Sequence, residues 1–111
     1  MNLLPNVENA YIDIRKLSEY VLNPTAPRGR HKARVFLSAL GIDRDRADNL
    51  AKLISQAVLA SVAQLGELDI YGQRYVVDCR IVTDDGDAIV RTAWIIRTGE
   101  DFPRLTTCYV V

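Results

Sequence analysis

The sequence predicts an α+β domain in which two or three N-terminal helices pack on a three- to four-stranded antiparallel meander sheet. Apolar residues recur with a helical period in the first part of the chain, and the period changes to two after Gly66. Two turn signals rich in acidic residues and glycine, at residues 84–87 and 98–103, then divide the later part of the chain into strands. Of the 111 residues, 49% are hydrophobic. This length and composition predict one domain over residues 1–111, with a core that needs no disulfide or metal.

Three helices are expected, over residues 13–21, 30–40 and 43–66. Asp13 and Asp43 are the caps of the first and third, Asn23-Pro24 stops the first, and glycines end the other two. The residues that recur at helical spacing, and so are expected to face the core, are Ile14, Leu17 and Val21; Ala33, Phe36, Leu37 and Leu40; and Ala47, Leu50, Ala51, Ile54, Ala57, Val58, Val62 and Leu65.

The strands expected after Gly66 are a short one near residues 68–71, a long hairpin of 74–82 and 88–97, and a last strand over 104–111. Alternation places Arg91, Ala93 and Ile95 on one face of the third. In the last strand, the same rule puts Leu105, Thr107 and Tyr109 on one face and Arg104, Thr106 and Cys108 on the other.

Charge and motif content exclude several classes of protein. Fourteen basic and fourteen acidic residues give a net charge of zero, which argues against binding nucleic acid or membrane through bulk charge. The charge is nevertheless divided, because residues 1–36 carry six basic and three acidic side chains and residues 67–111 carry five and eight. No signal peptide or apolar span is recognisable, so a cytoplasmic protein without membrane contact is expected. The sequence has a single histidine and contains neither a P-loop nor a C-x-x-C pair, so we expect no metal and no cofactor. Cys79 and Cys108 are interpreted as buried hydrophobic residues.

The first candidate site is the start of the second helix, Arg28-Gly29-Arg30-His31-Lys32-Ala33-Arg34, where four of seven residues are basic and none is acidic. Basic side chains beside the free N–H groups of a helix start suit a phosphate. The alternative is a basic helix start that is merely exposed to water, because runs of charged residues are common on protein surfaces.

The second candidate is Arg91, in the middle of an apolar strand. Such an arginine pairs with an acid, extends to water or binds an anion. A salt bridge with Asp78 on the neighbouring strand and an anion site are the two alternatives. The third candidate is the last strand, where Arg104 with Thr106 or Thr107 would hold a phosphate. Tyr109 would stack on a base or donate a hydrogen bond. Strand propensity alone also explains its threonines and tyrosine.

The sequence resembles a family of small bacterial proteins, domain of unknown function 6883, over nearly its whole length. The segments that carry the resemblance are Lys16-Leu17, Tyr20-Val21-Leu22-Asn23-Pro24, Gly29 to Phe36, Leu40-Gly41, Tyr71 to Asp78, Thr92 to Arg97 and Gly99 to Leu105. Members look like the toxin-type fold of barnase, EndoU, the tRNase colicins and RelE, in which helices precede an antiparallel sheet that cleaves RNA.

The resemblance implies metal-independent attack of an RNA 2′-hydroxyl on the adjacent phosphate. His31 or Lys32 would be the acid or base, Arg91 and Arg104 would clamp the phosphate, and Thr106, Thr107 or Tyr109 would orient it. The sequence has no evident Glu and His pair on its sheet, which favours an arginine and lysine site of the RelE kind. The expected partners are an RNA substrate and a cognate antitoxin-like protein. The alternative is a non-enzymatic interaction module, such as an antitoxin, immunity protein or adaptor.

Overall fold

The computed structural model of the protein describes residues 2–111 and has the predicted α+β architecture. The helical elements are η1 (Val7–Asn9), α1 (Ile14–Lys16), η2 (Leu17–Val21), α2 (Arg30–Leu40), η3 (Arg44–Arg46), α3 (Ala47–Ala57) and η4 (Val58–Ala60). The strands are β1 (Ala63–Asp69), β2 (Gly72–Thr83), β3 (Gly86–Arg97) and β4 (Arg104–Val110). They form one antiparallel sheet in the order β1-β2-β3-β4, which confirms the predicted meander.

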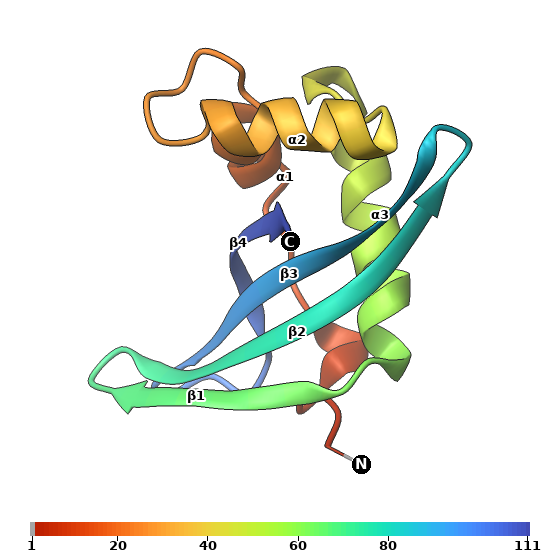
Figure 1. The fold of residues 1–111 in the computed structure, drawn as a ribbon. Coiled ribbons are helices and arrows are strands. Elements are labelled where there is room, and N and C mark those ends of the chain that lie inside the picture. Colours follow the sequence, from red (N-terminus) through yellow and green to blue (C-terminus); the bar gives the residue numbers. More distant parts are fainter. Residues whose placement is uncertain (1) are drawn as a thin grey trace.

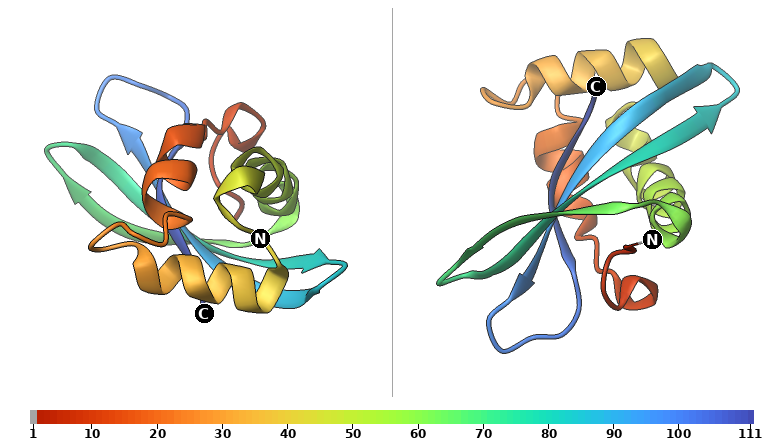
Figure 2. Two further views of the ribbon diagram at one scale, coloured as in Figure 1. Left: turned by 90° about the horizontal axis from the view of Figure 1, so that it is seen from above. Right: turned by 60° about the horizontal axis from the view of Figure 1, so that its bottom comes forward.

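The helices cover one face of a strongly twisted sheet, as Figures 1 and 2 show. In Figure 1, α3 runs behind the sheet, and α2 lies across its top, beside the hairpin of β2 and β3. The Thr83 hydroxyl fastens this hairpin to the end of α2, because it donates a 2.7 Å hydrogen bond to the Leu40 carbonyl. We call the helix-covered side of the sheet the inner face and the opposite side the outer face.

The inner face supplies the core of the protein. Val77, Cys79 and Ile81 of β2 are buried against the helices, as the alternation of β2 predicts. The core contains both cysteines, which confirms their interpretation as small buried hydrophobes. Burial raises the pKa of the Cys108 thiol to about 12, because a thiolate there would be poorly solvated.

The first two helices begin and end as predicted. Asp13 caps α1, since its side chain accepts a 3.0 Å hydrogen bond from the backbone N–H of Arg15. Gly41 ends α2 in the left-handed conformation, with φ of 66°. The predicted core faces are too wide, however, because Ile14 and Leu37 are exposed. The buried residues of the first helix are Leu17 and Val21 of η2, which packs against β4. The core residues of α2 form a narrow stripe of Ala33, Phe36 and Leu40.

The prediction of one helix as far as Gly66 is wrong. The regular helix ends at Ala57, η4 adds one turn, and β1 begins at Ala63. Val62 and Leu65 are 49% and 74% exposed, although their spacing continues the apolar stripe of the helix. Pairing of β1 with β2 satisfies the backbone of this segment and overrides the local helical pattern. The strand expected near residues 68–71 therefore exists but begins earlier.

The predicted faces of β4 are also wrong beyond its first residues. Trp94 pairs with Leu105 while its neighbour Ala93 pairs with Thr107, so Thr106 is an extra residue at a β-bulge. Leu105 and Cys108 consequently both face the core. The bulge reverses the alternation, and the positions of Arg104, Thr107 and Tyr109 pair with outer-face positions of β3.

Candidate functional site on the outer face of the sheet

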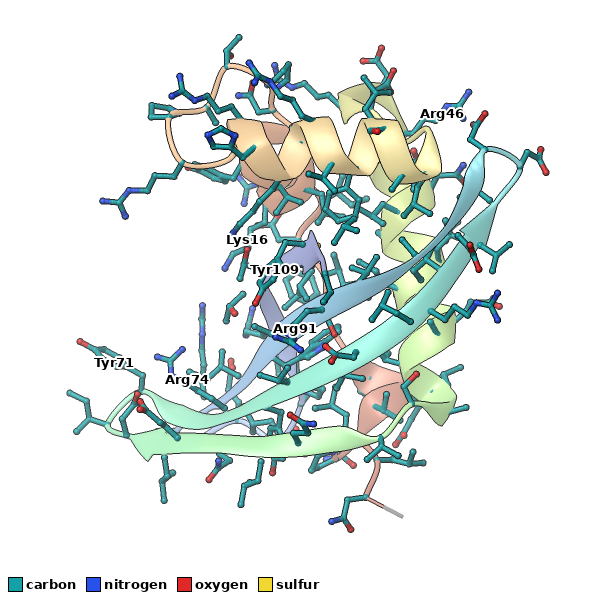
Figure 3. All side chains as sticks on the ribbon, viewed as in Figure 1. Lys16, Arg46, Tyr71, Arg74, Arg91 and Tyr109 are labelled. Atoms are coloured by element: carbon teal, nitrogen blue, oxygen red, sulfur yellow. The ribbon has the colours of Figure 1, made fainter. Side chains whose placement is uncertain are left out.

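The outer face brings together side chains from α2, β3 and β4. Arg91 of β3 lies directly opposite Tyr109 of β4 in the sheet register, and Ala93 lies opposite Thr107. In Figure 3 the side chain of Arg91 lies in front of β3 and β2, and Tyr109 lies between it and α2 in this view. Arg46 lies apart from both residues in this view.

Lys32 joins this group from the first turn of α2. Its ammonium Nζ donates a 3.1 Å hydrogen bond to the Thr107 hydroxyl and lies 5.5 Å from the centre of the Tyr109 ring. The second distance is that of a cation–π contact. We call Lys32, Arg91, Thr107 and Tyr109 the Lys32 cluster. It unites two cations and two hydroxyls, which are groups that bind phosphate oxygens.

Arg91 also pairs with Asp78, as the sequence predicted. Its Nε and one terminal nitrogen donate to the two carboxylate oxygens at 2.9 and 3.0 Å. The pKa of Asp78 falls because of this hydrogen-bonded contact, and the pKa of Arg91 rises, first through Asp78 and then through Tyr109. A guanidinium has five N–H donors, so the pair leaves donors of Arg91 for an anion. The pair is partly exposed, with 41% of the arginine side chain accessible.

His31 lies at the rim of the Lys32 cluster. It is exposed, and it lines a small cavity of about 260 Å³ together with Lys32, Val35, Tyr109 and Val110. An imidazole can accept or donate a proton near neutral pH. His31 therefore shares a cavity with both the lysine and the phenol of the cluster.

Arg104 lies in a different environment from the Lys32 cluster. It forms a bidentate pair with Glu100, with both N–O distances at 2.9 Å, and this contact lowers the pKa of Glu100. Its guanidinium also lies 4.7 Å from the Phe102 ring centre and 5.2 Å from that of Tyr11. Of these partners, Tyr11 belongs to the N-terminal segment, which forms a parallel bridge with β4 at Arg104. The guanidinium of Arg104 is thus in contact with one carboxylate and two aromatic rings.

Thr106, the third hydroxyl named from the sequence, is engaged at the bulge. Its hydroxyl donates a 3.1 Å hydrogen bond to the Ala93 carbonyl, which supports the extra residue. Of the residues predicted from the sequence, the structure gathers Lys32, Arg91, Thr107 and Tyr109, adds His31 at the rim, and leaves Arg104 and Thr106 in other contacts.

A larger cavity lies beside Lys32, and the sequence did not predict it. It has a volume of about 510 Å³ and is lined by Glu19, Tyr20, Val21, Asn23, Thr25, Ala26, Pro27, Arg28, Gly29, Lys32 and Thr107. The loop signals of residues 23–29 were visible in the sequence, but nothing local shows that this loop folds over against β4. We call this cavity the loop pocket.

The described residues show no metal centre and no membrane-spanning helix. Within residues 2–111, no group of three or more His, Cys, Asp or Glu side chains is arranged to hold a metal ion. The helices of this part of the chain are too short or too polar to cross a bilayer.

Comparison with known proteins establishes the family and the fold. No curated protein matches the chain. A solved structure titled as a contact-dependent growth inhibition toxin–immunity protein complex from Klebsiella pneumoniae 342 contains a chain with the same fold, at a TM-score of 0.66 and 15% identity. The similarity covers 90% of this protein and 98% of that chain. Residues 3–111 match the family described as a domain of unknown function, DUF6883, and so the protein belongs to that family, as the resemblance of its sequence predicted.

Proposed function

We propose that the protein is a small RNA-cleaving toxin whose active site is the Lys32 cluster with His31 at its rim. The observation that carries this proposal is the convergence of Lys32, Arg91, Thr107 and Tyr109 from three separate elements. A fold needs no such gathering of cations and hydroxyls for stability, because partly exposed charged contacts contribute little to it.

The chemistry is transesterification at an RNA phosphate. The 2′-oxygen forms a bond to phosphorus, the bond from phosphorus to the 5′-oxygen breaks, and a 2′,3′-cyclic phosphate and a 5′-hydroxyl result. In the proposed roles, His31 takes the proton from the 2′-hydroxyl and Lys32 donates one to the departing 5′-oxygen. Arg91 stabilises the negative charge that develops on the phosphorane oxygens, and Thr107 and Tyr109 orient the phosphate.

The fold supports this proposal by analogy. The neighbour of similar fold comes from a toxin–immunity protein complex, and a barnase, EndoU, colicin or RelE type of ribonuclease fold is part of our proposal. Fold by itself carries no activity, so the analogy adds to the site and does not replace it. The same neighbour supports a protein partner of the antitoxin or immunity kind.

The test is cleavage of total RNA by purified protein in the presence of EDTA. We expect wild-type protein to leave 2′,3′-cyclic phosphate ends, and Lys32→Ala to lose at least about a hundredfold in rate, the contribution typical of acid–base groups. Lys52→Ala is the matched control, because it removes the same charge from an exposed position on α3. RNA that stays intact with wild-type protein, freed of any co-purified partner, would overturn the proposal.

A second function, a non-enzymatic interaction module, is favoured by a different observation. Both arginines that the sequence suggested as phosphate clamps are paired with carboxylates, Arg91 with Asp78 and Arg104 with Glu100. Such pairs suit a module of the antitoxin, immunity or adaptor kind, because arginines that already have acidic partners need no phosphate. It predicts that wild-type protein leaves RNA intact and protects cells from a toxin encoded nearby.

A further inference from the structure

We propose that a second cavity on the outer face, apart from the Lys32 cluster, binds a phosphate group. The cavity has a volume of about 90 Å³ and is not lined by any residue of that cluster. Its walls include Tyr11, Asp13 and Lys16 from the N-terminal part of the chain, and Ile95, Arg97 and Arg104 from β3 and β4. We call it the Arg97 cavity. The inference does not rest on the proposed function, because holding an anion requires no reaction.

Three basic residues from three elements meet at the Arg97 cavity. Arg104 of β4 lies opposite Ile95 of β3, and Arg97 follows two residues later on the same face. Long side chains in such diagonal positions of neighbouring strands are within reach of one another. Lys16 comes from α1, which follows the segment that pairs with β4 through Tyr11. The lining contains three basic residues and one acidic residue, Asp13, so its charge is positive.

Arg97 differs from the other arginines of the sheet. Within residues 2–111 it forms no salt bridge, whereas each of the other four strand arginines pairs with a carboxylate, namely Arg74, Arg80, Arg91 and Arg104. Lys16 forms none in this part of the chain either, although it is partly buried. Removing a cation from water without a counterion costs free energy, and a bound anion would offset that cost.

The charge of Lys16 acts at the wall of the Arg97 cavity. The pKa of Asp13, which lines the cavity, is lowered first by hydrogen bonds from Arg15 and also by the charge of Lys16. Because such an effect weakens with distance, the Lys16 ammonium lies near this carboxylate. Asp13 is already paired with Arg15, so it does not neutralise the lysine.

The charge of Arg97 acts beside Arg104. The pKa of Glu100, which binds Arg104, is lowered first by the hydrogen bonds from Arg104 and also by the charge of Arg97. The two guanidinium groups therefore lie near the same carboxylate. Arg104 is held by that carboxylate and by the Tyr11 ring, which makes it a fixed wall. Lys16 and Arg97 are the two cations of the lining that remain for a ligand.

The size of the Arg97 cavity suits one compact anion. Its 90 Å³ is the share of about three water molecules in the liquid, and small-molecule sites begin at about 300 Å³. A ring system is thus too large, whereas a tetrahedral oxyanion fits. Guanidinium and ammonium groups form strong, charge-assisted hydrogen bonds with phosphate oxygens, and two cations balance the charge of a phosphate dianion.

Two sources offer this chemistry, a free phosphate ion and a phosphate of an RNA strand on the outer face. Ile95 lies two residues along β3 from Ala93, the partner of Thr107 in the Lys32 cluster. Two strand residues span about 7 Å, so one extended strand of RNA can reach both places.

The first test is a titration with inorganic phosphate in a Lys32→Ala background, in which the Lys32 cluster is impaired. We expect phosphate to shift the amide NMR signals of residues 11–16 and 95–106. Adding Arg97→Gln or Lys16→Gln should raise the Kd for phosphate at least about tenfold, the scale of one hydrogen bond between charged groups. Arg97→Lys keeps the charge and should retain most of the affinity.

Matched controls remove the same charges elsewhere. Arg46→Gln and Lys52→Gln, in the same background, change exposed residues of η3 and α3 and should leave the titration unchanged. No phosphate binding in the Lys32→Ala protein, or binding that Arg97→Gln and Lys16→Gln both leave unaltered, would overturn the proposal.

A second test identifies the source of the phosphate. It measures how salt weakens binding of a short 2′-O-methyl RNA, which cannot be cleaved at its 2′-oxygens. If RNA supplies the phosphate, Arg97→Gln should reduce the slope of log K against log salt by about 0.7, the value for one contact with a single strand. If a free ion supplies it, the slope should stay unchanged while the phosphate titration still responds to Arg97→Gln.

The outcomes keep this inference distinct from the proposed function. Phosphate binding that depends on Arg97 and Lys16, in a protein that leaves RNA intact, would support the Arg97 cavity and count against the RNA-cleaving function. Cleavage that depends on Lys32, in a protein whose phosphate binding ignores Arg97 and Lys16, would do the reverse.

Discussion

The ammonium of Lys32 donates a 3.1 Å hydrogen bond to the hydroxyl of Thr107, and so joins the first turn of α2 to β4 across 75 positions of sequence. The contact holds the lysine over the Tyr109 ring and forms the common wall of the Lys32 cluster and the loop pocket. It is therefore a contact on which the proposed RNA-cleaving site depends.

Removing the Thr107 hydroxyl should loosen Lys32 without unfolding the protein. We expect Thr107→Val to weaken binding of inorganic phosphate severalfold and to cost about 1 kcal/mol or less in stability, the scale of one partly exposed hydrogen bond. Thr107→Ser keeps the hydroxyl and should bind as wild type. Calorimetric titration and urea unfolding measure the two quantities, and equal phosphate affinity in the Val and Ser variants would contradict the positioning role.

Thr92 is a buried hydroxyl with two partners, and its loss should cost stability. It donates to the Val77 carbonyl at 2.7 Å and accepts from the Trp94 indole at 2.8 Å. Thr92→Val removes the acceptor of the buried Trp94 indole N–H, and we expect a loss of about 1 to 3 kcal/mol in urea unfolding. Thr92→Ser keeps the hydroxyl and should lose less, even though it removes a methyl group from the core. A valine variant as stable as the serine variant would show that water replaces the hydroxyl.

Arg104 is expected to stabilise the fold rather than to cleave RNA. Its contacts with Glu100 and Phe102 order the β3–β4 connection, and its contact with Tyr11 holds the N-terminal segment against β4. We expect Arg104→Met, which keeps the alkyl chain, to lower Tm by a few degrees while RNA cleavage per folded molecule stays unchanged. Calorimetry and the RNA assay measure this. Lost cleavage at an unchanged Tm would restore the phosphate-binding role that the sequence suggested.

The two cysteines should be inert in the folded protein. Both are fully buried, and burial raises the pKa of each thiol, to about 12 for Cys108. Thiolate is the reactive form, so alkylation at pH 8 should be negligible until denaturant opens the core. Mass spectrometry after iodoacetamide treatment, with and without guanidinium, counts the modified sites. Rapid labelling of the native protein would mean that the core opens readily.

Asp78 should contribute to a loss of stability in acid. Its pKa is lowered in the folded state by the hydrogen bonds from Arg91. A group with a lowered pKa stabilises above its unfolded pKa, about 3.9 for aspartate, and that contribution disappears as pH falls through the folded value. Urea unfolding between pH 7 and pH 2 should thus show a shallower acid decline for Asp78→Asn than for wild type. Parallel curves would mean that the exposed pair is too screened to matter.

The local elements were largely predictable from the sequence, because their signals are local. Asp13 at a cap, Gly41 after a helix and the period-two run of β2 each depend on neighbouring residues, and each lies where it was predicted. The end of the third helix was not predictable in this way. The segment containing Val62 and Leu65 satisfies the helical period, and only pairing with β2 decides that it is a strand.

The sequence predicted which types of residue form the candidate site, but not which individual residues come into contact there. Basic residues at the start of α2, an arginine in β3 and hydroxyls in β4 were all named from the sequence. The tertiary structure determines which of them are in contact. Arg104 pairs with Glu100, and Glu19, which was not predicted, lines the loop pocket.

The sequence by itself thus determined an α+β fold with helices before a meander, because hydrophobic period and capping act within a few residues. Only the tertiary structure decided the site, because one extra residue at Thr106 reverses the faces of β4 and brings Thr107 and Tyr109 beside Arg91. Strand register depends on a partner distant in sequence, and no local pattern specifies it.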